Sequence, residues 1–418
     1  MILLAHPGIS DHSPQTYPPW GVLDVATTLA DADLEVTVVD LNGPEPAARL
    51  RRLCERLDPR IVGLTGKLGE GARRLRMCLD EIRGFPFRVA VGGPLVSSYP
   101  DPSDGLWHGV DALFLGEAET SFLRWVKRGA PKELAPLRGS PADLDAVAMS
   151  ARWGALKNYV FDGIRAGGER VPTLHVSGAR GCTRRCTFCY LSRHLDRGLF
   201  RTISGPVLLE RCEALGHRTG AKGFYFVDDC LIEPRSEASE KLLDALIASD
   251  HAFSFGCDLQ LHELSDLALV ERLHHAGFRS LYVGVESVTP RIRRLLGKGP
   301  TPSDIAEDVN TVVSLGFEVV AALGVGWPTE SEGEMLATVA LAKSLENVQI
   351  DAFRYTPLPG VPLTSFWAKA SGVDPSEASI DPYTDYSTRS RSWAPPSLLD
   401  PAASAYAELS SLALESRR

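Results

Sequence analysis

Short apolar runs alternate with amphipathic stretches along most of the chain, and this alternation is the feature that most restricts the fold. The apolar runs that we expect to form strands in the first part of the chain are 2–5, 34–39, 61–64, 88–91 and 112–115. Between them lie stretches with the period of a helix, such as 21–32 and 71–83. Strands that alternate with helices form parallel sheets with helices packed on their faces. Residues 1–130 are therefore predicted to form a doubly wound α/β domain.

The alternation stops between residues 131 and 172, where Pro, Gly, Ala and Asp are frequent, and we predict a linker there. It resumes with expected strands at 174–176, 223–227, 252–257, 280–285, 318–325 and 351–355. Successive strand-helix units of this kind favour a partial (β/α)6 barrel over residues 173–370, with the active site at the carboxyl ends of its strands. Residues 371–418 are expected to form a C-terminal extension with a helix at 402–414.

Composition and charge exclude several classes of function. A chain of 418 residues exceeds what one hydrophobic core usually organises, which agrees with at least two domains. The formal net charge of -9 argues against a broad grip on nucleic acid and favours a small-molecule substrate. No apolar run approaches the roughly 20 residues that span a bilayer, and the first residues lack the pattern of a signal peptide. We therefore expect a cytoplasmic protein with no membrane contact.

Three of the eight cysteines lie close together after the first expected barrel strand. Cys182, Cys186 and Cys189 have the spacing C-x3-C-x2-C. Thiolates suit an iron–sulfur cluster or zinc. Structural zinc needs a fourth protein ligand, for which His175 and His194 are the nearest candidates, so zinc and chance clustering remain as alternatives. The scattered cysteines, which we expect to be small buried hydrophobic residues, are Cys54, Cys78, Cys212, Cys230 and Cys257.

The cysteine spacing and its place after a barrel strand resemble the radical S-adenosylmethionine (SAM) superfamily. In that superfamily three thiolates hold a 4Fe-4S cluster and leave one iron open to the amino and carboxylate groups of SAM. An electron from the cluster then cleaves SAM, usually to a 5'-deoxyadenosyl radical. The resemblance, which extends over about residues 1–370, implies Cys182, Cys186 and Cys189 as the cluster ligands. It also implies an external electron donor of the flavodoxin or ferredoxin type.

Further positions follow the superfamily pattern in chain order. By this resemblance, Phe188 packs near the adenine of SAM, and Asp228 or Asp229 at a strand end meets its amino group. A polar strand end that caps the next helix is the structural alternative for either aspartate. Glu286 ends a strand that resembles the GxES type and would lie near SAM or the substrate. Gly326 belongs to a segment that resembles the GxPxE loop, whose glycines and proline chiefly shape a turn.

Four side chains are candidates for the substrate side of the site. We expect Tyr190, Glu286, Arg354 and Tyr355 near the substrate, with Tyr190 also near the cofactor. A carboxylate such as Glu286 at the end of an apolar strand is costly to bury without a partner. Arg354 could equally be a solvated or ion-paired arginine.

Residues 1–130 and 359–363 narrow the resemblance to one subgroup. Residues 359–363 resemble the PGTPL segment of the subgroup that carries an N-terminal cobalamin (B12)-binding domain of Rossmann-like fold, with valine in place of the threonine. Residues 1–130 resemble that domain through Tyr17-Pro-Pro-Trp-Gly21, Asp40 and the Gly92-Gly93 pair. The cofactor contacts that this implies are Thr65, Gly66, Gly92, Gly93 and Glu117.

Two departures from the subgroup keep a second reaction open. The domain has no D-x-H-x-x-G motif that would ligate cobalt from below, and Lys67 and Glu70 stand where small hydroxyl residues are usual. With cobalamin, we expect a radical SAM methyltransferase that acts on a small-molecule natural product. With a degenerate B12 domain, the radical would drive deoxygenation, rearrangement, cyclisation or transfer of another SAM-derived group.

Two further classes of function are disfavoured by the sequence. Methylthiolation of tRNA or protein needs additional cluster cysteines in the N-terminal domain, where only Cys54 and Cys78 are found. A regulatory module that binds zinc or a cluster is the non-enzyme alternative. A sensor, however, has no need of carboxylates at the ends of barrel strands.

Overall fold

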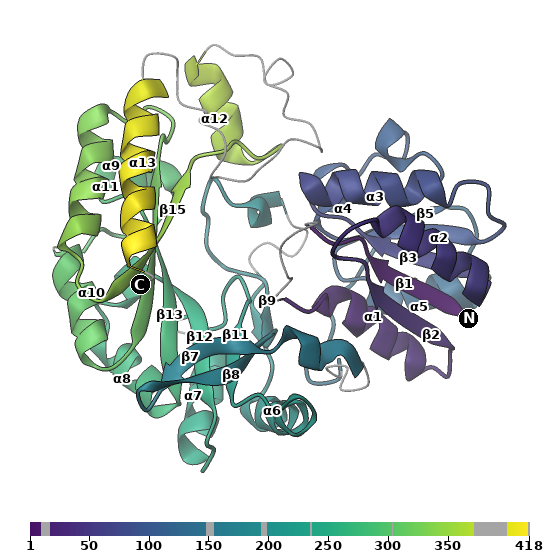
Figure 1. The fold of residues 1–418 in the computed structure, drawn as a ribbon, viewed down its shortest axis with the longest axis horizontal. Coiled ribbons are helices and arrows are strands. Elements are labelled where there is room, and N and C mark those ends of the chain that lie inside the picture. Colours follow the sequence, from purple (N-terminus) through teal and green to yellow (C-terminus); the bar gives the residue numbers. More distant parts are fainter. Residues whose placement is uncertain are drawn as a thin grey trace. The chain divides into compact units, whose positions relative to one another are not determined.

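The computed structural model describes residues 1–9, 17–147, 154–193, 199–234, 236–302, 304–371 and 399–416. The chain divides into two compact units, one built mainly from Met1–Tyr159 and one mainly from the residues that follow. In Figure 1 the first unit runs from purple to blue and the second from teal to yellow. No helix in these ranges is both long and apolar enough to cross a bilayer.

The first unit contains a six-stranded parallel sheet with the order β2-β1-β3-β4-β5-β6. Its strands are β1 (Ile2–His6), β2 (Val36–Asp40), β3 (Ile61–Thr65), β4 (Arg88–Gly92), β5 (Ala112–Leu115) and β6 (Leu137–Arg138). Its helices are α1 (Trp20–Ala30), α2 (Pro46–Leu57), α3 (Glu70–Glu81), α4 (Pro94–Ser98) and α5 (Glu119–Lys127), with 3-10 turns η1 (Gly105–Trp107) and η2 (Gly154–Tyr159).

Alternate residues of each strand of the first unit enter two separate apolar cores. Leu3 and Val62 pack with Leu50 of α2 and Leu75 of α3 on one face of the sheet. On the other face, Ile2, Leu4 and Phe114 pack with residues of α1 and α5 such as Leu29 and Trp125. The sheet is thus covered by helices on both faces, and the predicted doubly wound, Rossmann-like domain is confirmed (Figure 1).

The order of the strands locates the crevice of the first unit. From β1 the chain crosses to β2 on one side, whereas β3 pairs on the other side of β1. In open α/β sheets, ligands bind outside the carboxyl ends of the strands at such a reversal. The loops that follow β1 and β3, together with the neighbouring loop after β4, therefore border the natural binding edge of this unit.

The second unit contains a curled seven-stranded sheet with the order β15-β14-β13-β12-β11-β8-β7. Its strands are β7 (Phe161–Ala166), β8 (Glu169–Val176), β11 (Gly223–Phe226), β12 (Ser254–Gln260), β13 (Phe278–Glu286), β14 (Glu318–Val325) and β15 (Val348–Arg354). All neighbouring pairs from β8 to β15 are parallel, and only β7 runs antiparallel. The predicted partial (β/α)6 barrel is confirmed, with β7 as an additional edge strand.

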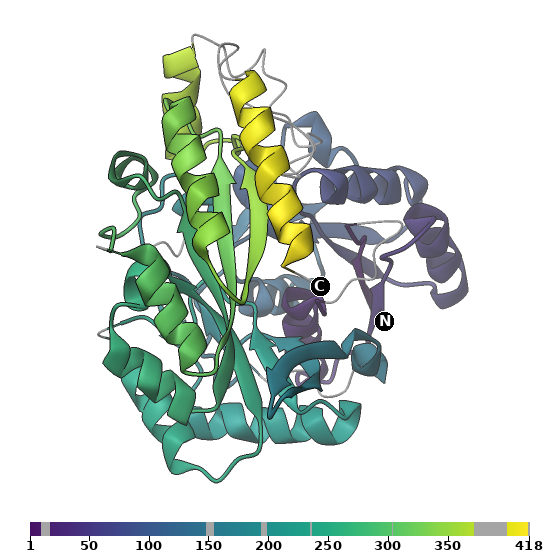
Figure 2. The same cartoon turned by 60° about the vertical axis from the view of Figure 1, so that its left-hand side comes forward.

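Helices cover the outside of the curled sheet (Figures 1 and 2). The helices of the second unit are α6 (Gly205–Thr219), α7 (Glu237–Ala248), α8 (Leu267–His275), α9 (Pro290–Leu296), α10 (Ile305–Ser314), α11 (Glu332–Ser344), α12 (Pro362–Ser371) and α13 (Leu399–Glu415). A small antiparallel pair, β9 (Ala179–Arg180) and β10 (Arg201–Thr202), and the turns η3 (Tyr190–Arg193) and η4 (Leu261–Glu263) complete the unit.

The segment that we expected to be an irregular linker, 131–172, contains ordered strands. Its β6 extends the sheet of the first unit, and β7 forms a hairpin with the start of β8. Gly167 and Gly168 connect the hairpin with φ angles of 60° and 88°, which suits the left-handed backbone of a tight two-residue turn. The sequence FDGIRA of β7 hides the strand because its polar residues fit an exposed sheet edge and not a core.

The helix expected at 402–414 is α13, which lies against β15 and α11 in both views (Figures 1 and 2). Two contacts join it to the last barrel strand. The backbone N–H of Ile350 donates to the hydroxyl of Ser416 at 3.0 Å. The guanidinium of Arg354 lies 4.5 Å from the ring centroid of Tyr406. Most of the extension 371–418, including residues 372–398, lies outside the described residues.

Candidate functional site

The three clustered cysteines lie on the loop that connects β9 to β10, beyond the carboxyl end of β8. Cys182, Cys186 and Cys189 are each partly exposed, whereas the five scattered cysteines are buried as expected. Pairing of Arg180 with Arg201 closes the base of the loop. Within the described ranges, no three His, Cys, Asp or Glu side chains are arranged for a single metal ion. A cubane cluster is larger than one ion and holds its thiolates further apart.

Glycine is required directly before the first cysteine. Gly181 has a φ of +84°, and a Cβ atom there would lie 1.6 Å from the carbonyl oxygen of Leu199 on the returning strand of the loop. A Cβ at Gly178 would lie 2.9 Å from the ring of Phe226 on β11. The backbone therefore approaches its neighbours more closely than a side chain allows, and this fixes the path into the cysteine loop.

The two aspartates after β11 have different partners. Asp228 is buried and accepts hydrogen bonds from the Ser177 hydroxyl at 2.6 Å and the Gly178 N–H at 2.7 Å. Burial raises the pKa of Asp228 to about 7, although these donors oppose the shift. Asp229 is exposed and accepts from the hydroxyl of Tyr190 at 2.9 and 3.2 Å. Asp228 thus anchors the backbone that enters the cysteine loop, while Asp229 holds the residue after its last cysteine.

Side chains within the loop make further ties to the barrel. Arg184 forms an ion pair with Glu263, whose side chain is only 2% exposed. The hydroxyl of Thr183 donates to Glu233 at 2.5 Å. The buried thiol of Cys230 hydrogen bonds to Cys182 and lowers the pKa of that thiol. The first half of the loop is therefore fixed by groups from the ends of β11 and β12.

The second half of the loop is fixed by the end of α9. Thr187 donates its N–H to the carbonyl of Leu296 at 2.9 Å and its hydroxyl to the carbonyl of Leu295 at 2.8 Å. The last carbonyls of a helix have no partner within the helix, so Thr187 satisfies groups that need one. Gly297 follows with a φ of +68°, and a Cβ there would lie 2.5 Å from the carbonyl oxygen of Arg185.

Glu286 pairs with a lysine that sequence reasoning missed. Its carboxylate lies 2.9 Å from the Nζ of Lys298, and the two side chains are 9% and 6% exposed. Glu286 has a φ of +65° and lies where the register of β13 against β14 shifts. The Lys298 Nζ is also 5.7 Å from the ring centroid of Phe188 in the cysteine loop. The only signal in the sequence was a lysine directly after the glycine that ends a helix.

A second missed residue contacts a cysteine directly. The amide nitrogen of Gln260, at the end of β12, donates to the Sγ of Cys186 at 3.7 Å. Its backbone N–H donates to Glu263, the partner of Arg184, so one strand end positions both contacts. Hydrogen bonds to cluster sulfurs are among the means by which proteins adjust such centres.

An aromatic group connects the cysteine loop with the loop after β14. Trp327, which is buried, lies 5.3 Å from Phe188 and 5.5 Å from Tyr355 between ring centroids. Tyr355 is itself 3% exposed within this apolar cluster. The structure therefore gives Tyr355 a packing position, and it directs Arg354 towards Tyr406 on α13. Of the four side chains expected at the substrate, Tyr190 directly follows the last cysteine and Glu286 pairs with a lysine beside the loop.

Polar pairs line the concave face of the curled sheet. Leu281, Val283 and Val285 of β13 are fully buried, so the alternate residues Tyr282 and Glu286 belong to the opposite face. The Tyr282 hydroxyl donates to Asp351 at 2.7 Å.

A similar pair lies on the neighbouring strands, where the Tyr225 hydroxyl donates to Asp258 at 2.8 Å. Burial raises the pKa of Asp258 to about 7. His175, one of the two histidines nearest to the cysteines as a fourth zinc ligand, stacks on Phe161 with 4.5 Å between the ring centroids. The other, His194, lies outside the described residues.

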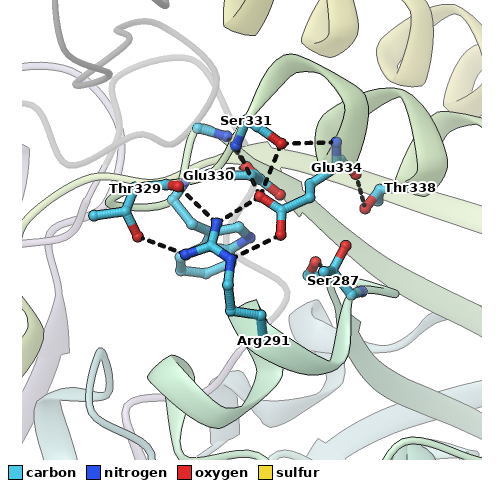
Figure 3. A network of polar contacts seen from close by, with 10 residues as sticks. Ser287, Arg291, Thr329, Glu330, Ser331, Glu334 and Thr338 are labelled. Atoms are coloured by element: carbon cyan, nitrogen blue, oxygen red, sulfur yellow. Dashed lines mark hydrogen bonds and ion pairs between the residues drawn. The ribbon is translucent and has the colours of Figure 1, made fainter.

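The loop after β14 surrounds a buried carboxylate. Gly326 and Trp327 donate their N–H groups to one oxygen of Glu330 at 2.7 and 3.0 Å. The other oxygen is buried without a hydrogen-bond partner. Figure 3 shows how Arg291 of α9 closes the loop by binding Thr329 and the carboxylate of Glu334. Gly326 thus belongs to a turn, and its backbone N–H binds the carboxylate of Glu330.

The predicted cofactor residues of the first unit converge at its binding edge. Gly66 donates its N–H to the carbonyl of Gly92 at 2.9 Å, and a Cβ at Gly93 would lie 2.5 Å from the hydroxyl of Thr65. These four residues therefore come together after β3 and β4. Glu117 follows β5, and its carboxylate accepts the N–H of Ala142 at 2.8 Å.

A buried polar group lies at the same edge, and of its members the sequence pointed to Asp40 but not to His6 or Tyr159. The Nδ1 of His6, the last residue of β1, is 3.1 Å from a carboxylate oxygen of Asp40, which ends β2. The other oxygen of Asp40 accepts from the hydroxyl of Tyr159. Burial alone would raise the pKa of Asp40, but these hydrogen bonds outweigh it and hold that pKa below its usual value. The edge is thus built from fixed polar groups and close backbone loops.

The buried Glu330 predicts a measurable pH dependence. Burial raises the pKa of Glu330 to about 8, so the folded chain keeps a proton that the unfolded chain has already lost. Its contribution to stability is therefore present below the ordinary glutamate pKa and is lost as the pH rises towards 8. In Glu330→Gln an amide oxygen still accepts from Gly326 and Trp327. We expect this variant to gain about 1 kcal/mol or more over the parent between pH 5 and 8.5.

The measurement is urea denaturation followed by circular dichroism at several pH values. The matched control is Glu332→Gln, which removes an exposed carboxylate from the first turn of α11 and should keep the pH profile of the parent. A Glu330→Gln profile that runs parallel to the parent from pH 5 to 8.5 would refute this assignment.

Comparison with known proteins finds a family model that matches the part of the chain around the cysteine loop. The model of the radical SAM superfamily matches residues 176–342, which include the cysteine loop and the strand ends around it. An uncharacterized methyltransferase of Pyrococcus horikoshii is 24% identical over 392 residues, covering 86% of this chain and 83% of that protein.

Solved structures share the fold of both units. TsrM from Kitasatospora setae, a radical SAM methyltransferase with tryptophan and a SAM analog bound, has a TM-score of 0.71 at 19% identity, covering 98% of this chain and 88% of that one. OxsB with aqua-cobalamin and SAM bound has a TM-score of 0.65 at 14% identity, covering 88% of this chain and 55% of that one. Residues 176–342 therefore form a radical SAM domain, and the chain has the two-domain fold of TsrM and OxsB.

Proposed function

We propose that this enzyme is a cobalamin-dependent radical SAM methyltransferase that acts on a small-molecule natural product. The observation that carries the proposal is a three-cysteine loop held from several sides at the carboxyl end of a parallel barrel. The Rossmann-like first unit supports the cobalamin part. So does the fold shared with TsrM and OxsB, both of which have structures with cobalamin bound.

The donor set of the loop fits a cluster with one open iron. Cys182, Cys186 and Cys189 would be its protein ligands, and Gln260 already donates to one of these sulfurs. Tyr190 and its partner Asp229 follow the last cysteine, so they are positioned for contacts with SAM. Phe188 lies between Trp327 and Lys298, where its ring could border an adenine.

The backbone at the binding edge of the first unit is suited to contact a corrinoid. Thr65 and Gly66 on one loop and Gly92 and Gly93 on the next present close-packed backbone without bulky side chains, and these four residues would face the cofactor. Lys67, in the loop after β3, is exposed and would have to lie along the edge of such a ligand.

When bound, the cluster supplies the electron that cleaves SAM, and the corrinoid supplies the methyl group. The chain itself binds and orients the reactants. On the concave face, Asp258 has a pKa of about 7 and can accept or donate a hydrogen bond near neutral pH. With Tyr225 and Tyr282, it forms a polar lining that suits a small substrate carrying hydroxyl or amine groups.

A second candidate function rests on the first unit. The exposed Lys67, and the use of the Glu117 carboxylate by the backbone of Ala142, would both suit a domain that no longer binds cobalamin. The enzyme would then use the radical for deoxygenation, rearrangement, cyclisation or transfer of another SAM-derived group. Retention of cobalamin by the folded protein decides between the two candidates.

The cluster assignment is tested with a pair of cysteine variants. We expect Cys186→Ala to lose the brown cluster absorbance and all reductive cleavage of SAM under anaerobic conditions, because one ligand is missing. Cys54→Ala, a buried cysteine of the first unit, is the control and should retain both. Iron, sulfide and cleaved SAM are counted per chain. Full iron content with SAM cleavage in Cys186→Ala would overturn the site.

The close backbone approach at Gly181 gives a further test. In Gly181→Ala the new methyl group meets the carbonyl of Leu199, so the loop must shift, and we expect cluster content after reconstitution to fall by at least half. Gly220→Ala is the matched control, because Gly220 has a φ of +80° but no atom within 4 Å of its Cβ position. It should bind iron normally. Equal iron in both variants would show that the loop accommodates the clash.

A further inference from the structure

The ion pair of Glu286 and Lys298 occupies a position that packing alone does not explain. Removing both charges from water is costly, and a buried ion pair is often no more stable than a well-packed apolar pair. Here the Nζ–Oε1 distance is 2.9 Å and both side chains are nearly inaccessible. The left-handed backbone at Glu286 adds conformational strain. A buried charge pair at a strained backbone is a reason to look for a function.

The pair lies directly beside the cysteine loop. A Cβ at Gly297, the residue before Lys298, would be 3.5 Å from the Cα of Cys186. The ammonium group also lies 5.7 Å from the ring centroid of Phe188, between Cys186 and Cys189 in sequence. The end of α9 thus places the ammonium group of Lys298 beside the part of the loop that carries the second and third cysteines, in addition to the buried guanidinium of Arg293.

We propose that Lys298 and Glu286 set the reduction potential of the cluster held by the three cysteines, with Lys298 raising it and Glu286 lowering it. This inference rests on the proposed cluster. One electron enters the cluster from an external low-potential donor, and no bond is formed or broken. The added negative charge interacts with nearby charges that water screens poorly, so a cation favours the reduced form and an anion opposes it.

The sign of each variant follows from the pair. Lys298→Met keeps a side chain of similar length but removes the ammonium group that pairs with Glu286, so reduction becomes harder. Glu286→Gln leaves the charge of Lys298 uncompensated, so reduction becomes easier. A purely structural pair would not give shifts of opposite sign, because either variant would simply loosen the same contact.

The experiment is a potentiometric titration of the reconstituted full chain, followed by electron paramagnetic resonance, without SAM or substrate. We expect Lys298→Met to lower the equilibrium constant for one-electron reduction at least tenfold, a shift of about 59 mV to more negative potential. Glu286→Gln should shift the potential in the opposite direction, and Lys298→Arg should stay near the parent. The control is Lys343→Met, because Lys343 forms an exposed pair with Glu408 on the helices of the same unit.

The outcomes separate this inference from the proposed function. A parent chain that holds no cluster overturns the proposed function and the inference with it. If the parent holds a cluster, but Lys298→Met and Glu286→Gln both keep the reduction potential of the parent or shift it in the same direction, the inference alone is overturned. If Lys298→Met loses its cluster, Glu286→Gln decides: a positive shift supports the charge pair, and an unchanged or more negative potential refutes it.

Discussion

The hydrogen bonds that Asp228 accepts from Ser177 and Gly178 fix the direction in which the chain leaves β8, and the site depends on that direction. The loop that follows has little regular secondary structure, so its order must come from side-chain ties that offset its conformational entropy. Those ties reach it from three other places: Glu263 at the end of β12, Glu233 after β11, and the last carbonyls of α9. A cysteine loop held in this way is prepared to bind before its cofactor arrives.

The same contacts explain why polar groups are buried at the mouth of the barrel. Charges from the loop and from the strand ends meet where parallel strands deliver their carboxyl ends, and each buried group then needs a partner. Arg184 has Glu263, and Lys298 has Glu286. The first unit uses the same principle at the ends of β1 and β2, where Asp40 receives hydrogen bonds from His6 and Tyr159. In both units the fixed polar groups lie where the topology places a ligand.

Much of the fold and the location of the site could be predicted from the sequence, because both depend on local patterns. Alternating apolar runs predict the strands of both sheets, and parallel strands bring their ends to one edge. The hairpin strand β7 was missed because an exposed edge strand needs no apolar face. Lys298 and Gln260 were missed because their contacts depend on where α9 and β12 end. Both ends lie against a loop that is distant in sequence. Arg354 was expected at the substrate, but its direction is set by Tyr406 on a helix near the end of the chain.

The central claim is that the two units serve one methyl transfer, with a corrinoid in the first and a cluster in the second. The most direct test is a visible spectrum and a cobalt count on anaerobically reconstituted protein that has been incubated with hydroxocobalamin and desalted. We expect about one corrinoid per chain together with a complete cluster. A complete cluster without retained cobalt would contradict it and would leave the first unit as a scaffold for other radical chemistry.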